Sequence, residues 1–268
     1  MYNYNLWLNF LVNKIRCFIA YRDSFFASLV NIIIKSMATG MLWITLYSIG
    51  GIDVEFSLHQ MLLYAIASIS LSQCLTWWDG PHLYALNIVK TGKIITEMLR
   101  PVPYPMIILL RGSTEFAVNF IIYSVPTFLF GLIFFKIQVH INIIQFTWFI
   151  ISFLLSYLVM FLFQMFLAIV SILTLELSGI LHFFHAVIML LSCQYIPLWM
   201  YPQSIQNLIQ LLPFQYVFYT PLSILTSQID WLSFVQTTAV ELLWIIILVI
   251  INFSVWKYAK TKVCIQGG

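Results

Sequence analysis

Two charged residues fall inside long apolar stretches of the sequence. Lys35 lies in a stretch that runs from Ser24 to Tyr47, and Glu241 lies in one that runs from Leu232 to Trp256. A charge at the centre of a membrane-spanning helix costs about 2.5–3.5 kcal/mol unless it is compensated. Such residues therefore line a polar path or contact another helix. We expect one of these roles for each, and a salt bridge between the two remains open.

Other residue patterns that could do chemistry are incomplete. His182 and His185, in the sequence HFFH, lie within one helical turn, but a metal site needs a third ligand. The pair Gly92-Lys93 lacks the glycine of a phosphate-binding loop, because Asn87 stands in its place, and no Ser or Thr follows. No Ser/His/Asp or Cys/His set is recognisable. We therefore expect no catalytic, cofactor or metal site in this chain.

The composition places these residues in a membrane protein. Of the 268 residues, 62% are apolar and 8% are charged, whereas soluble domains have about 25% charged residues. The net charge of +3 is too small to indicate nucleic-acid binding. The sequence predicts a single all-α transmembrane domain over residues 1–268. It comprises an interfacial helix over 1–23, a bundle of six spans over 24–256 and a tail over 257–268. The expected spans are about 24–47, 60–78, 112–135, 144–173, 180–198 and 232–256.

The basic residues predict the orientation of the bundle. With six spans, ten of the twelve lysines and arginines fall on one side, and Lys136 alone falls on the other. The positive-inside rule then places both termini and the loop from Asp79 to Pro105 in the cytoplasm, and the protein in the cell membrane. The ten residues are Lys14, Arg16, Arg22, Lys90, Lys93, Arg100, Arg111, Lys257, Lys260 and Lys262.

The predicted cytoplasmic loop is the most informative segment. From Tyr84 to Leu99 its apolar residues recur at helical spacing, and RPVPYP follows and ends the helix. A short amphipathic helix of this kind can pass motion between a soluble partner and a membrane bundle. The alternative is a surface helix anchored by its basic residues. Just beyond the loop, Arg111 and Glu115 are spaced to pair with each other.

Two motifs carry a resemblance to a known family. The stretch TGKIITEMLRPVPYP is similar to a loop of ABC-2-type transporter permeases, in particular the viologen-exporter or multidrug branch. Near the other end, PLWMYPQSIQNLIQLLPFQYVFYTPLSIL resembles that family's segment before the last span. The two motifs occur in the family's order and on a six-span layout. The resemblance covers essentially the whole chain, although SILTSQ stands where family members often have a glycine.

The resemblance implies a transport subunit that works with other chains. Its partners would be a second permease chain, identical or related, membrane lipid, and two cytoplasmic ATP-binding subunits that hold ATP and magnesium. The coupling helix would map to Leu86–Arg100, and a broken segment over residues 199–230 would enter the membrane from outside. The residues implied for coupling are Thr91, Lys93, Glu97 and Arg100, and those for the outer gate are Pro213, Phe214 and Pro221.

The expected function is therefore that of an exporter permease. It would move a lipophilic or amphipathic compound (a drug, a peptide antibiotic or a lipid-like molecule) out of the cell. The alternative is a stand-alone ion- or proton-coupled carrier that uses Lys35 and Glu241.

Overall fold

The computed structural model describes residues 2–49, 57–75, 80–99, 101–139, 141–174, 178–227 and 229–261. Every regular element in these ranges is helical, which confirms the all-α prediction. Helices suit so apolar a chain because a helix satisfies its backbone polar groups within its own segment. In chain order the elements are α1 (Tyr2–Ala20), α2 (Arg22–Ile49), α3 (Leu58–Ser72), α4 (Pro81–Lys90), α5 (Ile94–Met98), α6 (Tyr104–Asn119), the π-helix η1 (Phe120–Ser124), α7 (Val125–Phe134), α8 (Ile143–Leu173), α9 (Ser178–Leu191), the 3₁₀-helix η2 (Leu198–Met200), α10 (Gln203–Gln210), the 3₁₀-helix η3 (Pro213–Tyr216), α11 (Tyr219–Thr226) and α12 (Trp231–Thr261).

Four of the described helices are long and apolar enough to cross a membrane. They are α2, the continuous α6–η1–α7, α8 and α12, with 28, 31, 31 and 31 residues, whereas a span needs about 20. They coincide with the predicted first, third, fourth and sixth spans. The third starts earlier than expected, at Tyr104 rather than Gly112. The reason is that Pro103 and Pro105 sit at the helix start, where a missing N–H costs nothing.

The helices at the predicted second and fifth spans are shorter. α3 has 15 residues and α9 has 14, so each is about 22 Å long at 1.5 Å per residue. The hydrocarbon core of a bilayer is about 30 Å thick, and neither helix crosses it alone. α9 ends where Cys193 takes a left-handed conformation with φ 58°. The count of six spans therefore stays a prediction.

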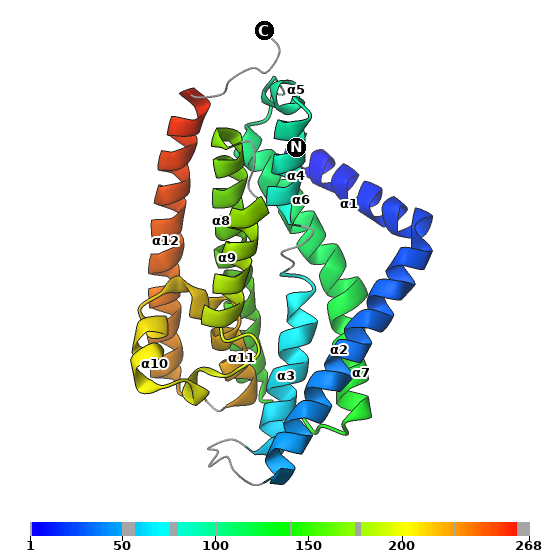
Figure 1. Ribbon diagram of the computed structural model, residues 1–268, viewed down its shortest axis with the longest axis vertical. Coiled ribbons are helices and arrows are strands. Elements are labelled where there is room, and N and C mark those ends of the chain that lie inside the picture. The colour runs from blue at the N-terminus through cyan, green and yellow to red at the C-terminus, as the bar shows by residue number, and fades with distance from the viewer. Residues whose placement is uncertain are drawn as a thin grey trace.

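The elements divide between two ends of the molecule (Figure 1). One end, here the α5 end, carries α5, both chain termini and α1, which turns away from α2 at Tyr21. The other end, the α10 end, carries η2, α10, η3 and α11. α4 lies beyond α3 along the long axis, and α2 and α12 flank the bundle on opposite sides. α1 is a separate helix within the predicted residues 1–23, and its interfacial location stays a prediction.

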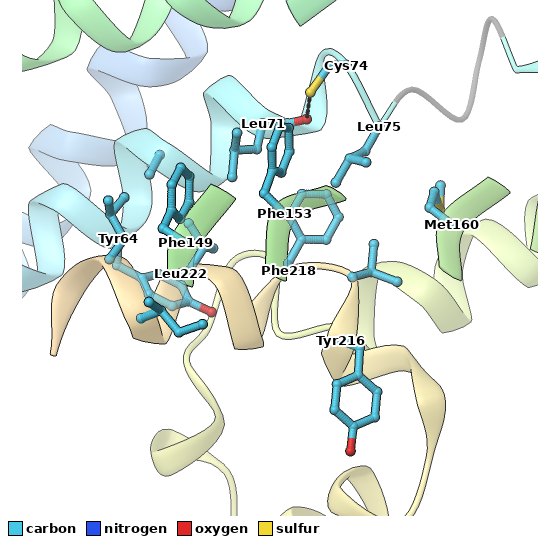
Figure 2. Close-up of a cluster of buried hydrophobic side chains, with 14 of the residues drawn as sticks. Tyr64, Leu71, Cys74, Leu75, Phe149, Phe153, Met160, Tyr216, Phe218 and Leu222 are labelled. Carbon is cyan, nitrogen blue, oxygen red and sulfur yellow. Dashed lines mark hydrogen bonds between the residues drawn. The ribbon is translucent and has the colours of Figure 1, made fainter. Parts of the chain in front are cut away.

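Helix α8 is the centre of the bundle. It is the most buried of the four long helices, and it contacts α12, α4, α11 and α6. A large apolar cluster joins α8 to α3 and α11, with Phe149 and Phe153 facing Phe218 and Leu222 (Figure 2). A second cluster at the α5 end joins Ala85 of α4 to α8 and α12. Movements at either end must therefore act on the same helix.

A close helix contact generates the first prediction. Gly131 of α7 packs directly against the buried side chain of Ile66 of α3, so the Cβ of any larger residue would overlap it. We expect Gly131→Ala to lower the free energy of unfolding by about 1–3 kcal/mol through overpacking. Thermal unfolding of the purified protein in detergent measures the change. Gly179→Ala, which meets no neighbouring atom within 4 Å, is the control; equal stability of the two variants would contradict the prediction.

Candidate functional site

The predicted coupling segment forms two helices instead of one. α4 ends at Lys90, a turn covers residues 91–93, and α5 begins at Ile94. Gly92 adopts φ 68°, and its N–H donates to the carbonyl of Val89 at 3.1 Å. A left-handed glycine is a common helix terminator because it has no Cβ to clash. The expectation of one continuous helix over Leu86–Arg100 is therefore wrong, and the cause is Gly92.

The break separates a packed part from an exposed part. α4 buries Ala85 and Ile88 against α8 and α12, whereas Thr91 and Lys93 are exposed at the turn. Leu99, just after α5, is 78% exposed. We call the exposed residues 91–93 together with Leu99 the tip. These residues are therefore accessible at the α5 end of the molecule.

The predicted coupling residues are distributed unequally over this segment. Thr91 and Lys93 lie on the tip, but the side chain of Glu97 is buried. Arg100 lies outside the described residues. Sequence reasoning missed Leu99, because a continuous helix would have placed it on the apolar face, and only the turn at Gly92 brings it to the surface.

Arg111 connects three elements at the α5 end. Its guanidinium lies 3.7 Å from the ring centre of Tyr84 of α4 and 4.9 Å from that of Phe10 of α1. A guanidinium over an aromatic face is attracted by the ring's quadrupole. We call this arrangement of Phe10, Tyr84 and Arg111 the arginine stack. It joins α1 and α4 to the start of the long α6–η1–α7 helix.

Two further contacts hold α1 on α6. Lys14 forms an ion pair with Glu115, with 3.9 Å between Nζ and Oε1, and the indole N–H of Trp7 donates to Ser113 Oγ at 3.2 Å. The expected Arg111–Glu115 pairing is thus replaced by other partners for both side chains. The sequence suggested an isolated pair within one helix, whereas the structure ties two helices together.

The segment before α12 is a series of short helices, and its entry into the membrane from outside stays a prediction. Between α9 and α12 the chain forms η2, α10, η3 and α11, none longer than eight residues. Pro213 and Pro221 are buried, and Phe214 stacks on Phe163 of α8 with ring centres 5.0 Å apart. The three predicted gate residues thus lie in one segment packed against α8.

Side chains of α3 and α8 satisfy the backbone of this broken segment. Tyr64 Oη donates to the carbonyl of Cys193 at 2.6 Å, and Ser156 Oγ donates to the carbonyl of Tyr216 at 2.6 Å. Irregular backbone among apolar helices needs such partners, since an unsatisfied carbonyl there costs several kcal/mol. We call these donors the carbonyl clamp. Its members and the carbonyls that they bind are Gln60 with Thr226, Tyr64 with Cys193, Ser68 with Gln194, Gln145 with Ile224 and Ser227, and Ser156 with Tyr216.

Lys35 and Glu241 occupy different environments. Lys35 is exposed on α2, and Glu241 is fully buried on α12. α2 and α12 flank the bundle on opposite sides (Figure 1). No ion pair joins the two among the residues that the structure describes, which answers the open question of a mutual salt bridge. Both carboxylate oxygens of Glu241 lack a hydrogen-bond partner within the described ranges.

The carbonyl clamp generates the second prediction. Gln145 Nε2 donates to two carbonyls, of Ile224 at 2.6 Å and of Ser227 at 2.9 Å. We expect Gln145→Leu to lower the free energy of unfolding by about 1–3 kcal/mol, because it leaves both carbonyls without this donor. Thermal unfolding in detergent is the measurement. Gln203→Leu, at an exposed position of α10, is the control; a loss no greater in Gln145→Leu would show that the clamp is unimportant.

Comparison with known sequences identifies the family of the chain. No curated protein and no solved structure gives a significant match. The sequence profile of a family described as "ABC-2 family transporter protein" matches residues 32–267. The match includes most of α2 and all elements from α3 through α12, and therefore the tip and the broken segment. Members of this family are membrane transport subunits that normally work with separate ATP-binding subunits. The chain belongs to the ABC-2 transporter family and is a membrane subunit of an ABC transporter.

Proposed function

We propose that this chain is the permease of an ATP-driven exporter. Two ATP-binding subunits, which hold ATP and magnesium, would bind the α5 end from the cytoplasm, and the chain would pair with a second permease, identical or related. The observation that carries the proposal is the tip, which presents Lys93 and Leu99 at the end of the molecule where the termini lie. The excess of basic residues in the predicted cytoplasmic segments supports this orientation in the cell membrane.

The packing of α4 gives a route for movement from the tip into the bundle. The tip is continuous with α4, and α4 packs on α8, which is the central helix. The arginine stack links α4 to α6 and α1 as well. In the proposed mechanism, closure of the ATP-binding subunits pushes the tip and rocks α4, α6 and α8 together. Buried Glu97 then positions the turn from inside, and Thr91 and Lys93 touch the partner.

The environment of Lys35 supports the second permease chain. Lys35 lies near the middle of α2 and is exposed there. An uncompensated lysine in the hydrocarbon core would cost about 2.5–3.5 kcal/mol. A neighbouring permease, or a polar path between two permeases, removes the side chain from lipid. This face of α2 is therefore the one that we assign to the subunit interface.

Two features support the proposed direction and cargo. The broken segment with Pro213, Phe214 and Pro221 would close the exit of the path and open it outward. An apolar cavity of about 510 Å³ between α3, η1–α7 and α8, lined by residues such as Phe120, supports lipophilic or amphipathic cargo. The viologen-exporter or multidrug branch remains part of the proposal.

A stand-alone ion-coupled carrier is the second candidate. The buried carboxyl group of Glu241 favours it, and the separation of Lys35 from Glu241 weakens it. Transport in cells that lack the associated ATP-binding subunits separates the two candidates: persistence there, abolished by Glu241→Gln, would establish the carrier.

The tip generates the third prediction. Lys93→Glu combined with Leu99→Asp should lower the affinity for the ATP-binding subunits about tenfold or more, because it removes a charge and an apolar anchor from one contact. Co-purification and ATP hydrolysis with the co-expressed ATP-binding subunit measure the loss. Lys257→Glu, on the exposed end of α12, is the control. Unchanged assembly and ATPase rate in the double variant would overturn the assignment of the tip.

The arginine stack generates the fourth prediction. Arg111→Lys keeps the charge but loses the flat guanidinium that lies over Tyr84 and Phe10. We expect assembly with the ATP-binding subunits to be unchanged and transport per ATP hydrolysed to fall about tenfold. The physical reason is that each lost cation–π contact is worth about 1 kcal/mol or more. Transport and hydrolysis measured together in proteoliposomes check this. Equal coupling in Arg111→Lys and the wild type would show that the stack is a static contact.

A further inference from the structure

A pocket lies in the angle between α1 and α2, and we call it the elbow pocket. It has a volume of about 380 Å³ and is lined by residues of α1, α2, α6 and η1. Figure 1 shows α1, α2 and the α6–η1–α7 helix along the sides of a triangle, with the turn at Tyr21 at one corner. Ligand pockets have volumes of about 300–1,000 Å³, so the elbow pocket is large enough for part of an amphipathic molecule.

Four of the polar side chains that line the elbow pocket have no hydrogen-bond partner among the residues that the structure describes. They are Lys14, Ser24, Ser28 and Asn119. A hydroxyl inside a helix can donate to a carbonyl of the preceding turn, as that of Thr39 does, but the two serines do not. Asn119 is only 4% exposed, and a buried amide without a partner is costly. A ligand with hydrogen-bond acceptors would supply the missing partners.

Lys14 supplies the charge of the pocket. Its Nζ lies 3.9 Å from Glu115 Oε1, farther than the about 2.7–2.9 Å of a charge-assisted hydrogen bond. The ammonium group therefore keeps its N–H donors for a closer acceptor. No Asp or Glu is among the described residues of the lining. The exposed charges nearby in the sequence, Arg16, Arg22 and Asp23, add a net positive charge, so the pocket favours an anion.

Three aromatic rings, one from each side of the triangle, form an apolar wall of the pocket. They are Phe18 of α1, Phe25 of α2 and Tyr123 of η1. Their ring centres are 6.0, 5.8 and 5.5 Å apart, so each ring contacts the other two. Rings packed on one another leave no aromatic cage for a quaternary ammonium group. The wall instead suits the hydrocarbon part of a ligand whose anionic group meets Lys14.

The surface of α1 indicates the depth of the pocket in the membrane. Val12, Ile15 and Ile19 are exposed apolar residues of α1, and their spacing of three and four puts them on one face of the helix. A helix with such a face and basic residues beside it is suited to the boundary between lipid headgroups and acyl chains. In this predicted position of α1, the elbow pocket lies where the phosphate groups of lipids lie.

We propose that the elbow pocket binds an anionic phospholipid. Lys14 pairs with the phosphate group, and the hydroxyl and amide groups of the pocket donate hydrogen bonds to its oxygens. The first carbons of the acyl chains lie on the aromatic wall. Basic pockets beside membrane-spanning helices on the cytoplasmic side suit such headgroups, and the proposed orientation puts α1 on that side.

A bound lipid would act on the arrangement of three helices. It would contact α1, α2 and the α6–η1–α7 helix at once, and it would therefore hold the angle between α1 and α2 at Tyr21. The inference goes beyond the proposed function, because the lipid is a resident ligand and not the exported compound. Binding itself requires only that the chain lies in a membrane.

The test counts lipids on the full-length permease by native mass spectrometry in detergent. The probe is dioleoylphosphatidylglycerol, and we expect saturable retention of one molecule per chain. Dioleoylphosphatidylcholine, which has the same acyl chains without the net charge, should bind about fivefold more weakly or less. Glycerol 1-phosphate, which has the phosphate without acyl chains, should not displace the lipid. No ATP-binding subunit is needed, so the outcome is independent of the third prediction.

Matched variants locate the site. Lys14→Gln removes the charge and Asn119→Leu removes the buried amide, and each should weaken binding of phosphatidylglycerol about fivefold or more. Lys257→Gln removes an exposed charge on α12, and Asn207→Leu removes an exposed amide on α10. Both of these controls should bind as the wild type does. If Lys14→Gln does not fold, Asn119→Leu and the comparison of the two lipids decide the question.

Three results would overturn the inference. They are no saturable retention of phosphatidylglycerol, equal binding of phosphatidylcholine, and full binding by Asn119→Leu or by a folded Lys14→Gln. Displacement by glycerol 1-phosphate would also overturn it, because the pocket would then take a soluble phosphate and not a lipid.

Discussion

The need to satisfy backbone carbonyls in an apolar environment governs this structure. The long helices satisfy their carbonyls with hydrogen bonds inside the helix. The broken segment before α12 cannot do so throughout, and water is scarce among apolar helices. The carbonyl clamp supplies the missing donors from α3 and α8, through residues such as Tyr64 and Ser156. α8 must therefore be central, because it carries donors for the broken segment on one side and the apolar contact with α12 on another. Without the clamp, the irregular backbone of the segment that we propose as the outer gate would leave buried carbonyls without hydrogen-bond donors.

The same central helix connects the two ends of the molecule. α8 packs on α4 near the tip and on α11 near the clamp, so a displacement of α4 reaches the broken segment through one rigid element. The parallel route through α6 is interrupted by the π-helix η1, whose wide turn precedes Pro126. π-turns are places where a long helix accommodates a local misfit. In the proposed mechanism, the continuous α8 and the interrupted α6–η1–α7 would respond differently to the same displacement of α4.

Much of the fold could be predicted from local signals. Long apolar runs located α2, α8 and α12, and the prolines of residues 199–230 indicated pieces too short to cross the membrane. The predictions failed where a tertiary contact or a single residue determines the local conformation. Gly92 divides the predicted coupling helix because its backbone takes a conformation that side chains disfavour, and beyond this break Leu99 is exposed and Glu97 is buried. The clamp could not be found in the sequence, because isolated Ser, Gln and Tyr residues on apolar helices give no sign of which distant carbonyls they contact.

The two charges inside apolar stretches show most clearly what a sequence leaves open. In the sequence, Lys35 and Glu241 look alike, as charged residues at membrane depth, yet Lys35 is exposed on a flanking helix and Glu241 is fully buried on α12. The cost of burial is the same kind of quantity in both cases, but what relieves it differs. A group on the surface of the chain is relieved by whatever covers that surface, which points to another subunit. A carboxyl group enclosed by its own chain avoids this cost by remaining protonated. The environment of each charge, rather than its presence, therefore separates Lys35, on the surface that we propose as the subunit interface, from Glu241, inside the bundle.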